Sequence, residues 1–371
     1  MTRLSSTRSA SPVGFGTYRW SGAPDHVAAL RRALDLGCSL VDTAPNYAPA
    51  EVRSRLGQVL APHRSQVRIV SKGGYLPGGG YSLDAPFLRS LIHSEARTVG
   101  RGHLDAFLVH NPEHLLRDHD EGEALDRIGA AFAVCAEQVA AGTIGSFGVS
   151  SNVLATPAVP LGQHTVDDYA RLATELGAGP ALRYVQFPHN LVERQALENA
   201  FLDRCRALGV TTVGNRPLSP RTPDGPMRIA DPPEGVHRAS TELLAELVAR
   251  PAGLGWLVQH WDEVASPDAL DYVEGLVDRA PRDPGAVGSR RTARDLIAAR
   301  RRELREAASA RTRELVGSPG VRDTLAGEAG QPVTLRACQT YLRDLDHVLV
   351  GFRRVADVDQ LAALFGDSGA P

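Results

Sequence analysis

Three short apolar segments of this sequence each end in a residue that can carry charge or transfer a proton. CSLVD ends at Asp42, VRIVSK ends at Lys72 and DAFLVH ends at His110, while Tyr47 follows Asp42 in a turn-rich stretch. Lysine is nearly absent from the chain, and a lysine that ends an apolar strand must find a counter-charge. If these segments meet, they deliver a carboxylate, an amine, an imidazole and a phenol to one site.

The chemistry that such a group could perform is proton transfer to and from an oxygen atom. A free phenol loses its proton near pH 10, and a cationic Lys72 beside Tyr47 is expected to lower that pKa while Asp42 keeps the lysine charged. His110 could hydrogen-bond to a carbonyl oxygen and position it. Such a tyrosine protonates a developing alkoxide, and in the reverse direction it acts as the base. No side chain supplies a hydride, so redox chemistry here would require a nicotinamide cofactor.

An alternation of strands and helices must position these residues. The apolar runs are short, continuous and rich in β-branched residues, which is typical of parallel strands covered on both faces. Residues 85–100 show helical spacing of apolar side chains, with Asp84 as the expected cap and Gly100 as the expected end. Regular alternation favours a (β/α)8 barrel over an open doubly wound sheet, although periodicity alone does not separate them. In a barrel, all carboxyl ends of the strands face one rim, so Asp42, Lys72 and His110 would meet there.

One long segment interrupts the alternation. We expect a flexible tail at 1–12 and a single barrel domain at 13–371, with a mainly helical elaboration at about 221–330 between strands six and seven. The elaboration is expected near the barrel mouth or between copies of the chain in a homo-oligomer. Its arginine-rich part, 289–317, predicts a solvated amphipathic helix with many i,i+4 Glu/Arg pairs.

Composition and charge narrow the class of protein. The sequence of 371 residues is 43% hydrophobic and 23% charged, as in ordinary soluble domains, and its net charge of −2 gives no reason to expect nucleic acid or a membrane as partner. The N-terminal segment is too polar for a signal peptide, and no stretch approaches the roughly 20 apolar residues that span a bilayer. The four cysteines form no CxxC pair and predict reduced, buried thiols in a cytoplasmic protein: Cys38, Cys135, Cys205 and Cys338.

In this order, several segments resemble the aldo-keto reductase family. They are GFGTYRW, LDLGCSLVDTAPNY, IVSKGG, LDAFLVHNPE, GTIGSFGVSSN, YVQFPHNLVER and HVLVGFRR, over roughly 12–218 and 333–362. The resemblance implies a (β/α)8 barrel that binds NADPH, less often NADH, across its mouth and reduces an aldehyde or ketone to an alcohol, or the reverse. It places the proton-donor tyrosine at Tyr47, with Asp42, Lys72 and His110 beside it.

The resemblance also implies contacts to the cofactor and to the substrate. The implied cofactor contacts are Thr17, Ser150, Ser151, Asn152, Gln186, Asn215, Arg216, Pro217, Leu218, Gly351, Arg353 and Arg354. The implied substrate contacts are Tyr18 and Asn111. No metal site is expected, because Pro112 discourages the helix that would bring His110 and His114 to one ion.

Three features depart from the family pattern. Asn215 and Arg216 stand where a tyrosine commonly stacks on the nicotinamide, and Asp357 stands where a basic residue or glutamine is usual near the adenosine phosphate. The 221–330 elaboration has no counterpart in an ordinary member and is expected to reshape the substrate pocket. Nearby guanidinium groups suit a 2′-phosphate, which favours NADPH over NADH. Two alternatives stay open, a lyase, dehydratase or isomerase that uses the Tyr/Lys/His group for proton transfer alone, and a subunit that binds cofactor without turnover.

Overall fold

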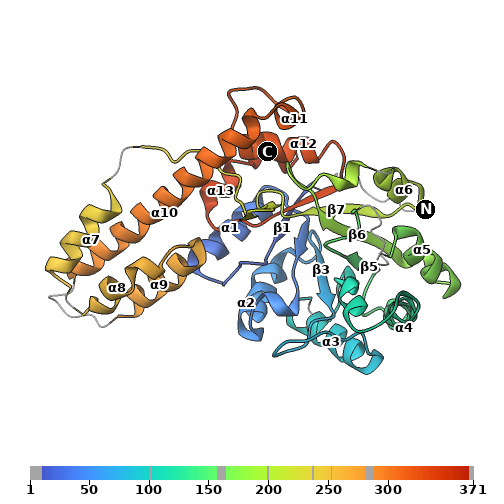
Figure 1. Cartoon of the computed structure of the whole chain (residues 1–371). Helices are drawn as coiled ribbons and strands as arrows, with labels where there is room; N and C mark the ends of the chain where they lie inside the picture. Colours follow the sequence, from blue (N-terminus) through green and yellow to red (C-terminus); the bar gives the residue numbers. More distant parts are fainter. Residues whose placement is uncertain are drawn as a thin grey trace, which may run out of the picture. The chain divides into compact units, whose positions relative to one another are not determined.

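Eight parallel strands close into a barrel in this computed structural model, which describes residues 11–100, 102–156, 164–198, 200–235, 238–251, 253–280 and 287–366. Around the barrel the order is β1-β10-β7-β6-β5-β4-β3-β2 (Figure 1). The strands are β1 (Val13–Gly16), β2 (Leu40–Asp42), β3 (Arg68–Gly73), β4 (Ala106–His110), β5 (Phe147–Ser150), β6 (Leu182–Pro188), β7 (Thr211–Asn215) and β10 (His347–Val350). The predicted (β/α)8 barrel is confirmed.

Helices connect the strands and cover the outside of the barrel (Figure 1). They are α1 (Pro24–Asp35), α2 (Ala50–Leu60), α3 (Ala85–Thr98), α4 (Glu121–Ala140), α5 (Val166–Glu175), α6 (Phe201–Ala207), α12 (Val333–Tyr341) and α13 (Val355–Asp359). Short 3-10 helices are η1 (Pro45–Tyr47), η2 (Ala61–His63), η3 (Pro112–Arg117), η4 (Gly179–Ala181), η5 (Gln195–Leu197) and η8 (Ala362–Leu364). Asp84 does precede α3, but its side chain makes no capping hydrogen bond, so that part of the prediction is wrong.

β1 is the barrel strand that the apolar runs did not reveal. It has only four residues, and two of them are glycines. A Cβ atom at Gly14 would lie 2.7 Å from Leu349 Cδ2 of β10 and 3.3 Å from the Leu40 carbonyl oxygen of β2, so a larger residue would require the Leu349 side chain to shift. Counting β1, the helical segment follows the seventh barrel strand and not the sixth.

The barrel interior is layered, with an apolar layer below a polar one. Alternate residues of a strand face the same side, and a buried cluster of inward residues fills the middle: Leu40, Val70, Ala106, Leu108, Tyr184, Val213 and Leu349. Two residues further along five of these strands come Asp42, Lys72, His110, Gln186 and Asn215. Because every second residue of a strand faces the barrel interior, these polar side chains lie one layer above the apolar cluster, at the carboxyl-terminal rim.

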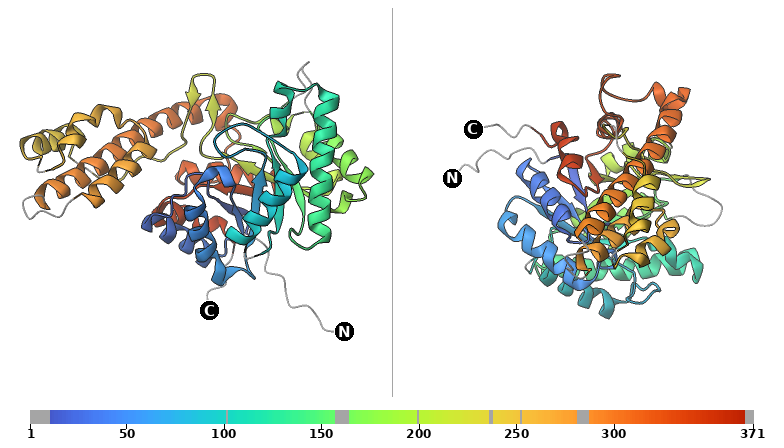
Figure 2. Two further views of the ribbon diagram at one scale, coloured as in Figure 1. Left: turned by 90° about the horizontal axis from the view of Figure 1, so that it is seen from below. Right: turned by 90° about the vertical axis from the view of Figure 1, so that its left-hand side faces the viewer.

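The chain divides into two compact units, the barrel and residues 227–324. The second unit contains α7 (Ser240–Ala249), α8 (Gly255–Gln259), η6 (Trp261–Glu263), α9 (Pro267–Arg279), α10 (Val287–Gly317) and α11 (Pro319–Arg322). In both views of Figure 2, α7 and α9 lie alongside α10. Its own apolar core includes Leu247, Trp261, Leu270, Val277 and Leu296.

Two arginines of α10 form ion pairs with acids of the neighbouring helix α9. Arg301 pairs with Asp271 and Glu274 of α9, at 2.6 and 2.7 Å. Arg294 likewise reaches Asp278 of α9, at 2.7 Å. The predicted i,i+4 pairing within one solvated helix is therefore wrong for these residues, because one face of α10 packs against α7 and α9 and brings their acids within reach.

Two further segments differ from the expectation or fall outside it. The stretch expected to be loop-like after β7 contains a small antiparallel hairpin, β8 (Arg221–Thr222) with β9 (Gly225–Pro226). Residues 1–10 of the predicted tail lie outside the described residues. Ser11, in contrast, is buried and its backbone N–H donates to Ser39 Oγ at 3.0 Å, so the tail prediction is wrong at that residue.

A buried ion pair joins two outer helices to the barrel wall. The Glu95 side chain of α3 is 1% exposed and binds the guanidinium of Arg53 on α2. Its second oxygen accepts a hydrogen bond from Ser71 Oγ of β3 at 2.7 Å. Glu95 therefore has a partner for each carboxylate oxygen despite its burial.

Replacing Arg53 with methionine is expected to lower the free energy of unfolding by about 3–5 kcal/mol, because it leaves the Glu95 charge buried without a counter-ion. Urea unfolding followed by circular dichroism measures this change. The double variant Arg53→Met/Glu95→Gln is the control and should recover part of the loss. An unchanged urea midpoint for the single variant would show that the pair does not stabilise the fold.

Candidate active site

Lys72, the only lysine in the sequence, lies wholly buried inside the barrel. Its Nζ donates to Asp42 Oδ2 at 2.6 Å and to the Thr43 carbonyl oxygen at 3.3 Å. An ammonium in an apolar interior is tolerated only beside a counter-charge. Asp42, itself 4% exposed, provides that charge from the neighbouring strand.

Tyr47 lies directly above this ion pair. The short helix Pro45–Tyr47 turns the chain back over the barrel, and Pro45 fixes the backbone at its start. Lys72 Nζ donates to Tyr47 Oη at 3.0 Å and lies 4.8 Å from the centre of the phenol ring. The His110 ring lies nearly perpendicular to that of Tyr47, with 6.0 Å between the centroids. The four residues chosen from the strand ends and the first loop therefore meet at one place.

The charge states of Lys72 and Tyr47 follow from burial and contact. Burial raises the pKa of Tyr47 to about 12, although Lys72 acts in the opposite direction. The expectation that Lys72 lowers the pKa of Tyr47 below its ordinary value is therefore wrong, because desolvation is the larger effect. Burial also disfavours the charge on Lys72, but Asp42 and Tyr47 outweigh it and raise the pKa of the amine. At neutral pH the site holds an ammonium and a protonated phenol.

His110 is a neutral imidazole at the end of β4. Burial, followed by the charge of Lys72 and the proximity of His114, holds the pKa of His110 well below its usual range. Its Nδ1 is buried and has no hydrogen-bond partner in the described part of the chain. A neutral imidazole keeps one N–H donor and one acceptor nitrogen, so it can hydrogen-bond to a ligand without adding a second cation to the site.

The loop after β3 contributes residues that the sequence analysis missed. The Tyr75 ring lies 5.0 Å from that of His110, and its hydroxyl accepts from Asn111 Nδ2 at 2.6 Å and lies 2.8 Å from His114 Nε2. Asn111 itself has a left-handed backbone, φ 53°, which asparagine tolerates better than most residues. A bridge to Tyr81 closes this loop into a hairpin. The only signal in the sequence was a tyrosine just after Lys72 in a glycine-rich loop.

Gln186 joins this polar layer from β6. Its Nε2 donates to Asp42 Oδ1 at 2.8 Å, so the two oxygens of Asp42 have separate partners. Its Oε1 accepts from Ser150 Oγ at 2.9 Å and lies 3.5 Å from Asn215 Nδ2. Three predicted cofactor contacts thus form one hydrogen-bonded group with the predicted catalytic carboxylate.

Comparison with known proteins identifies the family. The sequence model of the Aldo/keto reductase family matches residues 12–240. The chain belongs to this family. It is an oxidoreductase, as the family and its reductase relatives indicate.

Two curated relatives of this aldo/keto reductase are themselves named as reductases. A 6-dehydroglucose reductase from Novosphingobium aromaticivorans is 26% identical over 269 residues, which cover 67% of this chain and 79% of that protein. A methylglyoxal reductase from Escherichia coli is 31% identical over 115 residues, 30% of this chain and 38% of that protein.

Solved structures share the fold. An aldo-keto reductase from Bacillus halodurans in its holo form has a TM-score of 0.55 at 12% identity, and covers 98% of this chain and 89% of that one. A glycerol dehydrogenase from Gluconobacter oxydans has a TM-score of 0.55 at 16% identity, and the match covers 97% of this chain and 88% of that protein. At these identities the likeness shows the (β/α)8 fold alone.

Other predicted cofactor residues of this aldo/keto reductase have partners within the chain. Thr17 Oγ1 donates to the Asp42 carbonyl oxygen at 2.9 Å and so ties the first loop to β2. Ser151 Oγ accepts from the backbone N–H groups of the turn that follows it, at 3.2 and 3.1 Å. The Asn152 backbone N–H donates to Glu113 Oε1 at 3.0 Å, and Asn152 itself is exposed.

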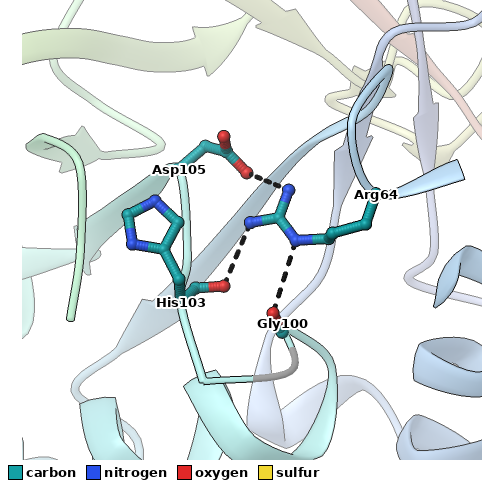
Figure 3. A pocket seen from close by; sticks show the side chains of 4 residues that line it. All are labelled: Arg64, Gly100, His103 and Asp105. Atoms are coloured by element: carbon teal, nitrogen blue, oxygen red, sulfur yellow. Dashed lines mark hydrogen bonds and ion pairs between the residues drawn. The ribbon is translucent and has the colours of Figure 1, made fainter. Parts of the chain in front are cut away.

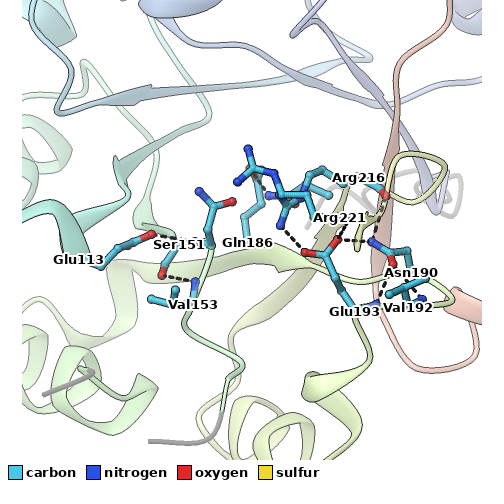
Figure 4. Close-up of polar contacts among 11 residues, drawn as sticks. Glu113, Ser151, Val153, Gln186, Asn190, Val192, Glu193, Arg216 and Arg221 are labelled. Carbon is cyan, nitrogen blue, oxygen red and sulfur yellow. Dashed lines mark hydrogen bonds and ion pairs between the residues drawn. The ribbon is translucent and has the colours of Figure 1, made fainter. Parts of the chain in front are cut away.

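Arg216 is held in a second polar group after β7. It has a left-handed backbone, φ 54°, and its Nη2 donates to Glu193 Oε1 at 2.6 Å. Glu193 Oε2 accepts from Asn190 Nδ2 at 2.8 Å and from the Arg221 backbone N–H at 3.1 Å. In the view of Figure 4, Gln186 lies between this group on one side and Glu113 and Ser151 on the other. Pro217 is buried and Leu218 is half-buried in the loop that follows.

The remaining predicted contacts lie on exposed loops. Gly351 and Arg354 are exposed and Arg353 is half-buried after β10. The Asp357 carboxylate accepts from the Arg354 backbone N–H at 3.2 Å, so the acid that departs from the family pattern stabilises the start of α13. Tyr18, 64% exposed, stands edge-on to Tyr47 with 5.1 Å between ring centroids.

A cavity of about 510 Å³ lies at the other end of the strands, lined by Arg64, Gly100, His103 and Asp105 (Figure 3). Asp105 directly precedes β4, which places this cavity at the amino-terminal end, opposite the rim used by barrel enzymes. Arg64 donates to the carbonyl oxygens of His103 and Gly100, and lies 2.8 Å from Asp105 Oδ2. These contacts occupy the Arg64 guanidinium, which connects the loop before β3 to the loop before β4.

Further features of the described residues bear on the sequence analysis. All four cysteines are buried and free. In the part of the chain that is described, no group of three His, Cys, Asp or Glu side chains could hold a metal ion. Within the same residues, none of the helices combines the length and apolar character needed to cross a membrane.

Acidification is expected to destabilise the fold through His110. Below pH about 6.5 the unfolded chain binds a proton on this imidazole and the folded chain does not until its lower pKa is reached, so the free energy of unfolding falls as the pH falls through that window. Between pH 7 and 5 this loss is as much as about 2 kcal/mol for one such histidine. Urea unfolding is measured at pH 7 and at pH 5 for wild type and for His110→Gln. Between these pH values, the free energy of unfolding of the variant should fall less than that of wild type. Equal losses in the two proteins would mean that folded His110 is protonated at pH 5.

Proposed function

We propose that this aldo/keto reductase reduces an aldehyde or ketone to an alcohol, and catalyses the reverse reaction, with Tyr47 as the proton donor. The observation that carries the proposal is the 3.0 Å contact between Lys72 Nζ and Tyr47 Oη above a buried Asp42. Because the ammonium must donate in that contact, the phenol oxygen is the acceptor, and its own O–H is left to donate to a substrate.

Each residue has a distinct task in this proposal. A carbonyl oxygen beside Tyr47 and His110 accepts hydrogen bonds from the phenol and from the imidazole N–H. As the carbonyl carbon gains a hydride, negative charge grows on the oxygen, and the Tyr47 proton moves to it. Lys72 stabilises the resulting tyrosinate, which regains a proton from water. Asp42 keeps Lys72 charged throughout the cycle.

The residues of the rim fit a nicotinamide cofactor. Ser150, Gln186 and Asn215 place hydroxyl and amide groups at the ends of three successive strands, and Asn215 Oδ1 is buried without a partner in the described chain. An unsatisfied acceptor of this kind suits the N–H donors of a carboxamide. When bound, reduced nicotinamide supplies the hydride that no side chain can.

NADPH is the form that we infer, with NADH as the alternative. Arg353 and Arg354 present guanidinium groups on the loop after β10, and a guanidinium suits the extra phosphate of NADPH. An aldo-keto reductase from Klebsiella pneumoniae, with a TM-score of 0.50 and 16% identity, was solved in complex with NADPH. That neighbour and the family match support the assignment.

The substrate that we infer is a small aldehyde or ketone with oxygen on the neighbouring carbon. The aromatic groups beside Tyr47 and His110 have polar tips, at Tyr18, Tyr75 and His114. Such groups solvate hydroxyl or carbonyl oxygens better than an alkyl chain. The names of the two curated relatives, a 6-dehydroglucose reductase and a methylglyoxal reductase, support this class.

The variant Tyr47→Phe tests the proton donor. Its kcat for reduction of methylglyoxal and of aldohexoses should fall by about 10²–10⁴-fold, which is the usual contribution of a general acid. NADPH binding, followed by the fluorescence of the reduced nicotinamide, should stay within about twofold of wild type, since phenylalanine keeps the ring. Tyr272→Phe, at an exposed tyrosine of α9, is the matched control and should keep wild-type turnover.

Two outcomes would contradict the proposed function. Turnover by Tyr47→Phe at the wild-type rate would remove Tyr47 as the proton donor. If the wild-type chain binds neither NADPH nor NADH, the redox assignment is removed and the lyase, dehydratase or isomerase alternative is favoured.

Arg354→Ala tests the choice between the two cofactors. Loss of an exposed guanidinium beside a 2′-phosphate should raise the Kd for NADPH by about tenfold and leave the Kd for NADH unchanged. Arg89→Ala removes a similarly exposed arginine on α3 and serves as the control for both cofactors. If the Kd values for NADPH and NADH rise by the same factor, Arg354 does not distinguish the cofactor that carries the 2′-phosphate from the one that lacks it.

A further inference from the structure

We propose that Gln186 is a positioning residue for the proton-donor site, which holds Asp42 in place and thereby keeps Lys72 charged beneath Tyr47. The inference rests on the proposed function, because it concerns the same site. It gives Gln186 a role in the electrostatics of the barrel itself, beyond the cofactor contact that the family resemblance implies.

The contact between Gln186 and Asp42 crosses the interior of the barrel. β2 and β6 are four places apart in the closed order of eight strands, so they form opposite walls. Gln186 Nε2 nevertheless lies 2.8 Å from Asp42 Oδ1, and both residues are nearly buried, at 2% and 4% exposure. A hydrogen bond of this kind fixes one wall of the site against the other.

The orientation of the Gln186 amide follows from its partners. A carboxylate can only accept, so the amide nitrogen must face Asp42. The amide oxygen then faces the opposite side, where the Ser150 hydroxyl donates to it at 2.9 Å. Asn215 Nδ2 approaches the same oxygen at 3.5 Å. Both ends of Gln186 are therefore held, and rotation of the amide would place its oxygen against the Asp42 carboxylate and lose that contact.

The Asp42 carboxylate has a separate side-chain donor on each of its oxygens. Lys72 binds Oδ2, and Gln186 is the side-chain donor to Oδ1. Without that donor, a buried carboxylate oxygen would be left unsatisfied. The charged form of Asp42 would then be less stable, and its attraction for the Lys72 ammonium would weaken. A weaker hold lowers the pKa of Lys72 and removes the charge that stabilises tyrosinate at Tyr47.

The single lysine of the chain makes this effect directly measurable. Protein grown on ¹⁵N-lysine has one labelled side chain, Lys72, and its amine resonance reports whether Nζ is charged. The experiment follows this resonance from pH 7 to 11 in the full chain without cofactor. It compares wild type with Gln186→Met, which keeps the length of the side chain and removes the donor.

Two further variants sharpen the comparison. Gln186→Asn keeps an amide but is one methylene too short to span the barrel, and it tests the inference even if the methionine variant does not fold. Gln138→Met makes the same change at a buried glutamine of α4 whose Oε1 has no partner in the described chain, and it is the matched control.

The expected result is a lower titration midpoint for Lys72, by about one pH unit or more, in Gln186→Met and in Gln186→Asn, and no shift in Gln138→Met. The rate of carbonyl reduction should fall by about tenfold or more in the two Gln186 variants. If Lys72 stays charged over the same pH range in wild type and in both variants, the inference is overturned, even where cofactor binding weakens.

The test separates this inference from the proposed function because the resonance of Lys72 needs no turnover. If the titration midpoint of Lys72 falls in the Gln186 variants but the wild-type chain reduces no carbonyl, the role of Gln186 is supported and the reductase proposal is contradicted. If the midpoint does not change but the wild-type chain is an active reductase, the role of Gln186 is contradicted and the reductase proposal is supported.

Discussion

The buried ion pair between Lys72 and Asp42 is the interaction around which the carboxyl-terminal end of the barrel is organised. Removing two charges from water is unfavourable, and it is offset only where every oxygen and N–H group finds a partner. Here Asp42 receives Lys72 and Gln186 on separate oxygens, and Lys72 donates to Asp42, Thr43 and Tyr47. The groups that make the pair tolerable inside the barrel are thus the groups that orient the proposed proton donor.

This arrangement also determines where protons reside. The site has one fixed cation, Lys72, and its presence contributes to keeping the nearby His110 neutral. Tyr47 keeps its proton because burial raises its pKa to about 12, above its ordinary value. At neutral pH Tyr47 therefore holds a proton that it can donate, and an alkoxide is a stronger base than tyrosinate and can accept it. The lysine acts by stabilising the tyrosinate once it forms.

The second unit is built on a different principle from the barrel. It has its own apolar core, and arginines of α10 pair with acids of α9 between helices. Its chain departs from the carboxyl end of β7 and returns through α12 to β10. Barrels accommodate additions at this end because the loops there are not part of the strand ladder.

The sequence by itself favoured the barrel, through its strand–helix alternation and its family resemblance, and it determined the positions of Asp42, Lys72 and His110 at the strand ends. Each of these residues ends a short apolar strand, and parallel strands must bring their carboxyl ends to one rim. Tyr47 was predicted from its place in the loop above Asp42. β1 was not recognised as a strand, because two of its four residues are glycines and the segment shows no apolar pattern.

Only the tertiary structure decided the partners and the charge states. Gln186 meets Asp42 from 144 residues away in the sequence, across the interior of a closed barrel, and no local pattern encodes that contact. Tyr75 reaches His110 through the fold of a glycine-rich loop. The pKa of Tyr47 rises where the charge of Lys72 alone predicted a fall, because desolvation depends on everything packed around a group and not on its neighbours in the chain.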